Sequence, residues 1–406
     1  MDPSSFRRAS ELPPYVFAEM AARKAEALAR GRTVYDFSLG NPDGDPPPRV
    51  VRALEAAERS GAFRYPASNG SRELREAAAR WYRRSYGVEL DPESEVLPLL
   101  GSKEGIGHLL LASLGPGDAV LVPSPSYPIH LAGGRMAGAE VVPVAIGPGE
   151  PFAENARRAA GEARGRLRGL VACFPHNPTG VAAPDGELER LLALADERDL
   201  FFLHDLAYAD LDFGRERAPS ALALAGARAR TVEFFSLSKS YNMAGFRVGF
   251  CCGNRDLVAA VARLKSYLDY GMFSPVQAAA IEALDRCGDF PGRLRELYRE
   301  RARSLIEGLR EAGWEAPMPG GTMFVWAPIP ARLRRLGSWA FSRALFDGAG
   351  VAVSAGAGFG APGEGPGGVV PGVAGGDGFV RFALVEDEAR TREACRAIGR
   401  WLKDGA

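Results

Sequence analysis

Short apolar runs alternate with longer stretches of helical periodicity through the middle of this 406-residue chain. That alternation is typical of a mostly parallel sheet with helices on both faces, so it favours an α/β architecture. In open sheets of this kind, ligands bind beyond the carboxyl ends of the strands. The expected strands cover residues 119–123, 140–144, 169–174, 200–205, 232–236 and 246–252. The expected helices cover 103–114, 127–137, 184–198 and 255–286, the last with a break near 271–275.

A smaller α+β region is expected from about residue 289. We therefore predict a large domain of residues 48–288 and a small domain built from residues 1–47 and 289–406. Residues 355–378, between the last two expected strands, hold eleven glycines and three prolines. Such a stretch buries too little side chain to offset its ordering entropy, so it is expected to be a flexible loop.

The charge balance limits the class of partner. Fifty Lys and Arg residues balance fifty Asp and Glu residues, giving a formal net charge of +0. No overall field then attracts nucleic acid or an anionic membrane. The first residues lack an apolar signal segment, and no run approaches the ~18 apolar residues of a membrane span. We expect a cytoplasmic protein. Five scattered cysteines without C-x-x-C, and four histidines without H-x-x-x-H spacing, predict neither a disulfide framework nor a metal site.

Lysine occurs at only five positions, so each lysine is informative. Lys24 and Lys403 are expected to be solvated near the termini. Lys265 falls on a long helix without a matched chemical neighbour. Lys103 opens another helix. Lys239 differs because it follows an apolar strand in the segment SLSKSYNMAGFRVGF.

Lys239 has Ser236 and Ser238 beside it and Arg247 eight residues later. Hydroxyls and a guanidinium around an amine suit a phosphate held next to that amine. Pyridoxal 5'-phosphate carries both a phosphate and an amine-reactive aldehyde, so it is the predicted cofactor, joined to Lys239 as a Schiff base. Ser236 and Lys239 also match the S-x-x-K of penicillin-binding proteins. The K-T-G and S-D-N motifs of those enzymes are absent from the sequence, which rejects that alternative.

Other polar residues follow expected strand ends. Asp205 ends the run LFFLHD and could pair with a protonated pyridine nitrogen, although a helix N-cap is the simpler interpretation. Tyr208, three residues on, could bind the ring's phenolic oxygen. Asn177 in FPHNPTG could share that oxygen, or the segment could be a simple turn.

Three further positions could complete a ligand site. Ser102 and Lys103 open a helix in GSKEG, where unpaired N–H groups bind phosphate well. Tyr127 in SPSYPIH could stack on a flat ring, or pack in the core. Arg381 in FVRFAL could bind a substrate carboxylate between the domains, or be a solvated edge residue.

In this order, the motifs resemble the pyridoxal-phosphate-dependent aminotransferases of class I/II, fold type I, over about residues 35–401. SLSKSYNMAGFRVGF carries the resemblance most specifically. Within that superfamily, GSKEGIGHLLLA, DAVLVPSPSYPIH, HDLAYAD and KSYLDYGMFSPVQ are similar to the subgroup of glutamate–pyruvate (alanine) and diaminopimelate-type aminotransferases. Residues 361–378 depart from the subgroup, which bears on how the substrate entrance is covered.

The resemblance implies a role for each matching residue. Lys239 would form the Schiff base and move the proton from the substrate's α-carbon. Asp205 would pair with the pyridine nitrogen, Asn177 and Tyr208 with the phenolic oxygen, and Tyr127 would stack on the ring. The phosphate cup would consist of Ser102, Lys103, Ser236, Ser238 and Arg247. Arg381, with Asn177 and the backbone at Gly40, would bind the α-carboxylate. Tyr65 would reach the phosphate of the neighbouring subunit in a homodimer with shared active sites.

The implied reaction moves an amino group between an L-amino acid and a 2-oxo acid by a ping-pong mechanism. Alanine or glutamate with pyruvate or 2-oxoglutarate is the expected pair, and a diaminopimelate or other amino acid aminotransferase is the alternative. Carbon–sulfur lyases, cyclopropane-forming synthases and oxidases use similar ring contacts, and fold alone does not separate them. A regulatory protein that retains this fold is disfavoured, because about thirty-five residues precede the first core segment and the net charge is zero.

Overall fold

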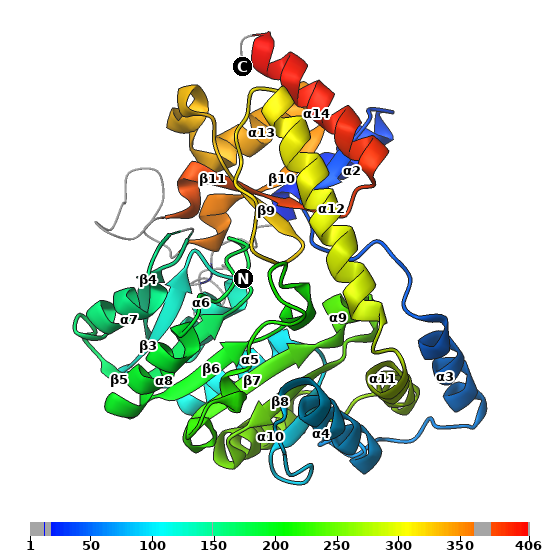
Figure 1. Cartoon of the computed structure of the whole chain (residues 1–406), viewed down its shortest axis with the longest axis vertical. Coiled ribbons are helices and arrows are strands. Elements are labelled where there is room, and N and C mark those ends of the chain that lie inside the picture. Colours follow the sequence, from blue (N-terminus) through cyan, green and yellow to red (C-terminus); the bar gives the residue numbers. More distant parts are fainter. Residues whose placement is uncertain (1–11, 13–17, 148, 361–374, 405–406) are drawn as a thin grey trace, which may run out of the picture.

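The computed structural model describes residues 12, 18–147, 149–360 and 375–404. A seven-stranded sheet with its helices forms the lower body in Figure 1, and a four-stranded sheet lies above it. The α/β fold class predicted from the sequence is confirmed. The larger sheet has the order β2 (Val96–Leu99), β8 (Gly249–Gly253), β7 (Thr231–Ser236), β6 (Phe201–Asp205), β5 (Arg166–Cys173), β3 (Asp118–Ser124), β4 (Glu140–Ala145).

Of these seven strands, β8 runs antiparallel to both of its neighbours, β2 and β7, and the other strands share one direction. Helices cover both faces. On β3, Ala119 and Leu121 pack in a cluster with α7 (Phe152–Ala160) and α8 (Glu187–Glu197). Val120 and Val122 pack on the other face with α5 (Ser102–Ser113), α6 (Pro128–Met136) and α10 (Arg255–Leu268). Burial on both faces explains why the strands are continuous apolar runs.

The smaller sheet has the order β1 (Tyr35–Phe37), β10 (Val351–Ala355), β11 (Phe379–Ala383), β9 (Phe324–Pro328). β1 pairs parallel to β10, with Tyr35 opposite Val351, so the N-terminal segment joins the C-terminal region. The domain boundaries themselves stay a prediction. Around this sheet lie α2 (Ala18–Ala29), α12 (Phe290–Glu311), α13 (Gly337–Ala349) and α14 (Glu388–Lys403).

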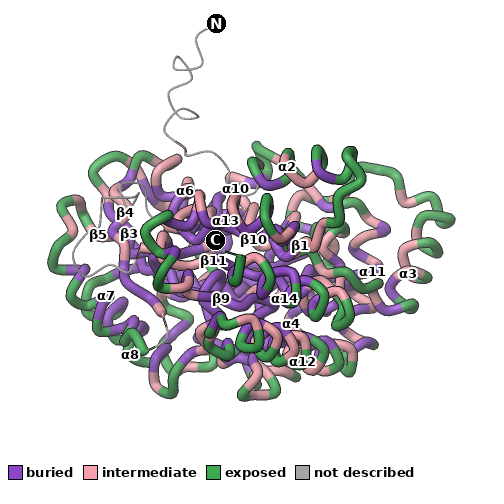
Figure 2. Tube along the Cα trace, turned by 90° about the horizontal axis from the view of Figure 1, so that it is seen from above, coloured by how far each residue is buried: buried purple, intermediate pink, exposed green. Residues whose placement is uncertain are grey.

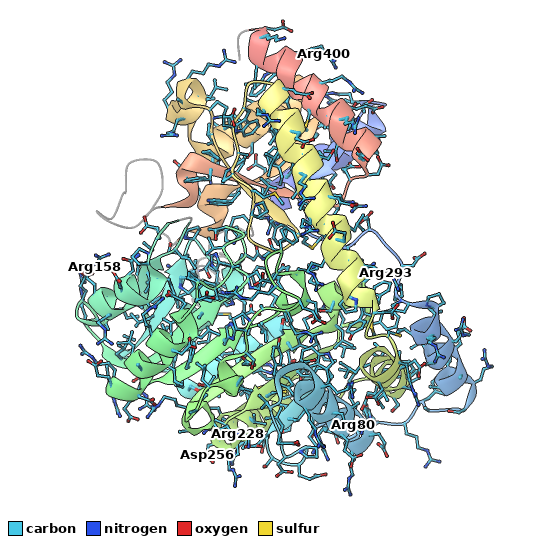
Figure 3. The ribbon with its side chains drawn as sticks, in the orientation of Figure 1. Arg80, Arg158, Arg228, Asp256, Arg293 and Arg400 are labelled. Carbon is cyan, nitrogen blue, oxygen red and sulfur yellow. The ribbon has the colours of Figure 1, made fainter. Side chains whose placement is uncertain are left out.

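Three helices complete the lower body beside β2 and β8: α3 (Pro48–Arg59), α4 (Arg72–Tyr86) and α11 (Ser274–Arg286). Buried positions concentrate along the two sheets and exposed positions on the outer turns of the helices (Figure 2). Charged side chains such as Arg80, Arg158 and Arg400 lie at the periphery (Figure 3). No helix within the described ranges is long and apolar enough to cross a membrane.

Two expectations about local structure are wrong in part. The strand expected at residues 246–252 begins only at Gly249, because Ala244–Phe246 forms a 3₁₀ turn and Arg247 has a left-handed φ of 58°. The expected flexible loop at 355–378 has ordered ends, since Gly356–Phe359 is a 3₁₀ turn in which Phe359 is fully buried. Residues 361–374 of that loop lie outside the described residues.

Candidate active site

A cleft of about 350 Å³ opens where the carboxyl ends of β5, β6 and β7 face the small sheet. This is the edge at which an open α/β sheet binds its ligand. Except for Tyr65, all of the site residues predicted from the sequence line the cleft: Gly40, Ser102, Lys103, Tyr127, Asn177, Asp205, Tyr208, Ser236, Ser238, Lys239, Arg247 and Arg381.

Lys239 lies on α9 (Leu237–Ser240), a single turn that follows β7 directly. The Ser236 hydroxyl accepts a hydrogen bond from the Ser238 N–H and so starts this turn. The Lys239 amine donates to the Gly40 carbonyl at 2.6 Å. Burial, followed by the charges of Arg381 and Arg247, lowers the pKa of Lys239 to about 7. The cleft therefore contains an amine that loses its proton near neutral pH.

Asp205, at the end of β6, is held by a chain of buried polar groups. Its Oδ2 lies 2.9 Å from His130 Nε2, and His130 Nδ1 lies 2.8 Å from the Ser126 hydroxyl. The other carboxylate oxygen accepts from the Ala207 N–H at 3.1 Å. All three side chains in the chain are buried. These contacts set the direction in which the carboxylate faces the cleft.

Asn177, in the turn after β5, lies between two other predicted site residues. Its side-chain N–H group donates to the Tyr208 hydroxyl at 3.4 Å, and its oxygen accepts from Arg381 Nη1 at 2.9 Å. Burial raises the pKa of Tyr208 well above its usual value, so the phenol stays protonated. The three side chains thus form one hydrogen-bonded row across the cleft.

Arg381, on β11, is 1% exposed, which rules out the solvated edge position considered from the sequence. Its Nη2 donates to the Ser38 carbonyl at 3.3 Å and to the Ser354 hydroxyl at 3.4 Å. The guanidinium carbon lies 4.0 Å from the centre of the Phe324 ring and 4.7 Å from that of Phe359. Two aromatic rings and neutral acceptors therefore hold a full positive charge at the cleft wall.

The opposite end of the cleft is built around the N-terminus of α5. Gly101 is the N-cap residue and provides no side-chain cap. Arg247 lies against it, with Nη1 donating to the Ala244 carbonyl at 3.0 Å and Nη2 to the Leu100 carbonyl at 3.2 Å. The Lys103 amine lies 5.8 Å from the centre of the Tyr127 ring. Helix N–H groups, hydroxyls and cations at one place are the chemistry that binds phosphate.

The charges in the cleft are unbalanced. Lys103, Lys239, Arg247 and Arg381 face it, whereas Asp205 is the one carboxylate among the lining residues. Within the part of the chain that the structure describes, neither Lys239 nor Arg247 forms an ion pair with a carboxylate. The arrangement suits a ligand that carries a phosphate at one end and a carboxylate at the other, next to an amine.

Tyr65 does not reach this cleft. It is 92% exposed and packs edge-on against Tyr270, with the ring centres 6.0 Å apart. Its predicted role toward a neighbouring subunit stays a prediction.

Sequence reasoning missed two groups of supporting residues. His130 falls three positions after Tyr127 in the same motif, but its bond to Asp205 crosses from the start of α6 to β6. Phe324 and Phe359, which flank Arg381, are ordinary aromatic residues in the sequence. Of these residues, only His130 could have been found from the sequence, because it is a histidine in the motif that also contains Tyr127.

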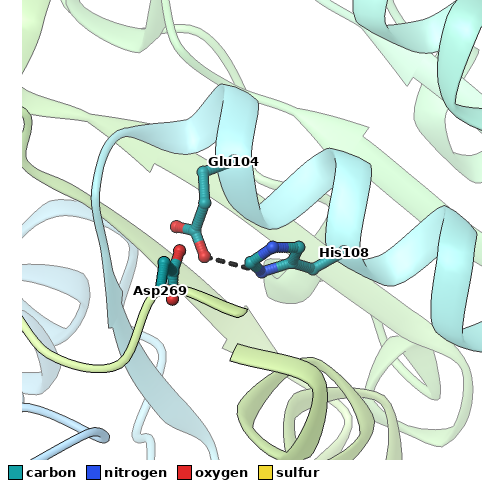
Figure 4. Close-up of side chains that lie close together, drawn as sticks. All are labelled: Glu104, His108 and Asp269. Carbon is teal, nitrogen blue, oxygen red and sulfur yellow. Dashed lines mark ion pairs between the residues drawn. The ribbon is translucent and has the colours of Figure 1, made fainter. Parts of the chain in front are cut away.

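Lys265 is also placed differently from the expectation that it has no chemical neighbour. It is buried, and its amine pairs with Asp269 at 2.9 Å and with Glu104 at 3.5 Å. Glu104, Asp269 and His108 form the one group of possible metal ligands found in the described ranges (Figure 4). The Lys265 ammonium already supplies a cation to both carboxylates. Lys24 is likewise paired, with Asp36 at 2.5 Å, rather than solvated.

Comparisons with known proteins show the family to which the chain belongs. The family described as "Aminotransferase class I and II" matches residues 32–398. The glutamate-pyruvate aminotransferase AlaC of Escherichia coli is 46% identical, over 97% of this chain and 92% of that protein. An LL-diaminopimelate aminotransferase of Syntrophobacter fumaroxidans is 39% identical, over 94% and 95%. The solved aspartate aminotransferase of Thermus thermophilus with maleate has a TM-score of 0.86 at 30% identity, covering 97% of this chain and 98% of that one. The chain belongs to the class I and II aminotransferases and is an aminotransferase enzyme.

Proposed function

We propose that this aminotransferase uses pyridoxal 5'-phosphate bound in the cleft, and that it exchanges an amino group between L-alanine and 2-oxoglutarate, or between L-glutamate and pyruvate. The observation that carries the proposal is the Lys239 amine, with a pKa of about 7, between a phosphate-binding helix end and a buried arginine. When bound, the cofactor supplies an aldehyde for an amine and a ring that withdraws electrons from the α-carbon.

Lys239 acts twice. As a neutral amine it would be the nucleophile that holds the cofactor, and as a free amine it would accept the proton of the substrate's α-carbon at Nζ. A pKa near neutrality suits both tasks, because the group can accept and release a proton at working pH. The Gly40 carbonyl, which accepts a hydrogen bond from Nζ, holds the amine toward the small-sheet side of the cleft.

Asp205, Asn177 and Tyr208 orient the cofactor's ring. The Asp205 carboxylate, fixed by His130, would present its negative charge to a pyridinium N–H and so stabilise the protonated ring nitrogen. The Tyr208 hydroxyl and the Asn177 side-chain amide group lie together, where both can donate to a phenolic oxygen. Tyr127 lines the same cleft and offers a ring face for stacking.

The two ends of the cleft bind the two anionic groups. Arg381 binds the substrate's α-carboxylate through its guanidinium fork, with Asn177 and the backbone at Gly40 beside it. The residues that would hold the phosphate lie at the other end, in and around the first turn of α5: Ser102, Lys103, Ser236, Ser238 and Arg247.

The substrate pair is supported by two observations. The chain is 46% identical to the glutamate-pyruvate aminotransferase AlaC. Leu39, Ala207 and Phe324 supply apolar side chains to the cleft, which suits a small aliphatic donor. Diaminopimelate is the alternative donor, since several LL-diaminopimelate aminotransferases are 36–40% identical to this chain.

A panel of donors tests the proposal. The holoenzyme is mixed rapidly with alanine, glutamate, aspartate, diaminopimelate, methionine or an aromatic amino acid, and the cofactor's absorbance is followed. Alanine and glutamate should convert it to pyridoxamine 5'-phosphate fastest. A faster reaction with diaminopimelate would reject the alanine–glutamate assignment. Ammonia and pyruvate released without an acceptor would indicate a lyase, and consumption of oxygen would indicate an oxidase.

We also propose a homodimer in which Tyr65 contributes to the partner's phosphate site. Exposed aromatic residues gather around it: Phe63 stacks on Phe273 with ring centres 6.2 Å apart, and Tyr267 is 84% exposed. Aromatic residues exposed together are typical of an interface. Sedimentation should give twice the chain mass, and Tyr65→Phe should weaken cofactor binding. A monomer that binds the cofactor fully would refute both parts.

A further inference from the structure

Lys265 is the buried cation of a partly buried cluster behind the phosphate end of the cleft. It is 1% exposed and lies on α10, which packs against α5. Its Nζ lies 2.9 Å from Asp269 Oδ1 and 3.5 Å from Glu104 Oε1. Glu104 Oε1 also lies 2.7 Å from His108 Nδ1, one turn along α5 (Figure 4). None of these four residues takes part in the proposed reaction.

Glu104 connects this cluster to the cleft. It lies in the first turn of α5, and its Oε2 accepts a hydrogen bond from the Leu100 N–H at 3.0 Å. Ser102 and Lys103, just before it in the same turn, line the cleft. A carboxylate in this turn that lacked a cation would repel a phosphate bound at the helix end, and because Glu104 is largely covered, water screens that repulsion less than at an open surface.

The ionisation of Glu104 and Asp269 explains why the positive charge of Lys265 matters for the nearby helix end. Burial acts to raise the pKa of Glu104, but hydrogen bonds with His108 and Asp269 and the charge of Lys265 hold it below its usual value. Burial and the neighbouring Glu104 raise the pKa of Asp269. Glu104, in the first turn of α5, is therefore the carboxyl group whose charged form the cluster favours more strongly.

We propose that Lys265 is a positioning residue for the phosphate end of the cleft, where its ammonium neutralises Glu104 and so raises the affinity of the first turn of α5 for the cofactor's phosphate. The inference rests on the proposed use of pyridoxal 5'-phosphate. It assigns Lys265 an electrostatic function toward a ligand group that it does not touch.

The test compares two ligands that differ only in the phosphate. Dissociation constants for pyridoxal 5'-phosphate and for pyridoxal are measured on the full-length protein and on Lys265→Met. We expect the affinity for pyridoxal 5'-phosphate to fall roughly tenfold, the effect of one nearby charge at an effective dielectric constant of about 20. The affinity for pyridoxal should stay within about twofold, because it carries no charge at that end.

Two further variants separate charge from structure. Glu104→Gln keeps an oxygen for the Leu100 N–H but removes the charge, so it should bind pyridoxal 5'-phosphate at least as tightly as the wild type, even where it lowers the melting temperature. Adding Glu104→Gln to Lys265→Met should restore the phosphate preference. Arg75→Met is the matched control, because Arg75 is a cation of α4 that is 5% exposed and pairs with a carboxylate, Glu93, but does not line the cleft.

Some results of these binding measurements would refute the role of Lys265, and another would refute the phosphate site. A Lys265→Met protein that keeps the full preference for pyridoxal 5'-phosphate over pyridoxal refutes the inference, as does a loss of affinity for both ligands alike. If Lys265→Met does not fold, weaker phosphate binding by Glu104→Gln refutes it. A wild-type protein with no preference between the two ligands would instead refute the proposed phosphate site itself.

Discussion

Gly101→Ala is expected to weaken cofactor binding by displacing Arg247. Gly101 has φ 88° and ψ 153°, a conformation that residues with a side chain rarely adopt. A Cβ built there would lie 2.3 Å from Arg247 Nη2 and 3.0 Å from its guanidinium carbon. Nη2 would have to retreat by about 1 Å to reach ordinary van der Waals contact. Its 3.2 Å bond to the Leu100 carbonyl would then break.

The substitution therefore has two effects of different origin. The backbone conformation alone costs about 1–3 kcal/mol of folding free energy. The displaced guanidinium also loses charge-assisted hydrogen bonds to a bound phosphate, each worth about 1.5–3 kcal/mol. We expect the dissociation constant for pyridoxal 5'-phosphate to rise at least roughly tenfold, which corresponds to about 1.4 kcal/mol.

Gly117→Ala is the control, because it should strain the backbone without displacing Arg247. Gly117 has φ 91°, precedes β3 at the edge of the sheet opposite the cleft, and a Cβ there would meet nothing within 4 Å. Both variants should lose stability in urea unfolding, and only Gly101→Ala should lose affinity in a cofactor titration. If Gly101→Ala bound pyridoxal 5'-phosphate like the wild type while losing as much stability as Gly117→Ala, the assignment of Arg247 to the phosphate would be wrong.

Three further substitutions test other contacts. Arg381→Gln should raise KM for every amino acid donor by roughly 100-fold, because all donors share the α-carboxylate, and unchanged steady-state kinetics would end that assignment. His130→Phe should lower kcat about tenfold, because Asp205 loses the hydrogen bond that holds it. The control His204→Phe removes an equally buried histidine–carboxylate pair and should lower stability alone. Equal effects of the two variants on kcat would contradict this role of His130. The pKa of Lys239 is ordinarily 10.5 and falls to about 7 in the folded chain. Between these pH values the unfolded state therefore binds more protons than the folded state. The free energy of unfolding of the cofactor-free protein should then rise with pH over that window. Lys239→Met should remove the slope, and a slope that persists would assign it to other groups.

The elements that were predicted correctly are those with a local signal. The continuous apolar run of β3, bounded by polar residues, indicates a strand that is buried on both faces, as its contacts with α7, α8, α5, α6 and α10 show, so both features can be recognised from one segment. The polar residues that end β5, β6 and β7 then meet at one edge because parallel strands share a direction. Asn177, Asp205 and Lys239 could therefore be grouped without knowledge of the tertiary structure.

Contacts between distant segments had no such signal. His130 follows β3 in the chain, whereas the residue that it contacts, Asp205, ends β6. β5 lies between these two strands in the sheet, so strand pairing alone does not bring the two side chains together. Phe359 lies in a glycine-rich stretch whose composition indicates disorder. Its burial against Trp326 and Arg381 depends on residues that follow or precede it by more than twenty positions. Such packing overrides local composition, and no window of the sequence contains both partners.

Arg247 shows how one reversed strand changes the origin of a site residue. Parallel strands contribute the residues that follow them, as Ser236 and Lys239 follow β7. β8 is antiparallel, so its beginning lies at the same edge, with Gly249 opposite both Leu99 and Ser236. A residue just before β8 therefore emerges between the end of β2 and the end of β7. Arg247 lies in the turn before β8, and its left-handed φ of 58° sets the direction in which its side chain leaves the backbone toward the cleft.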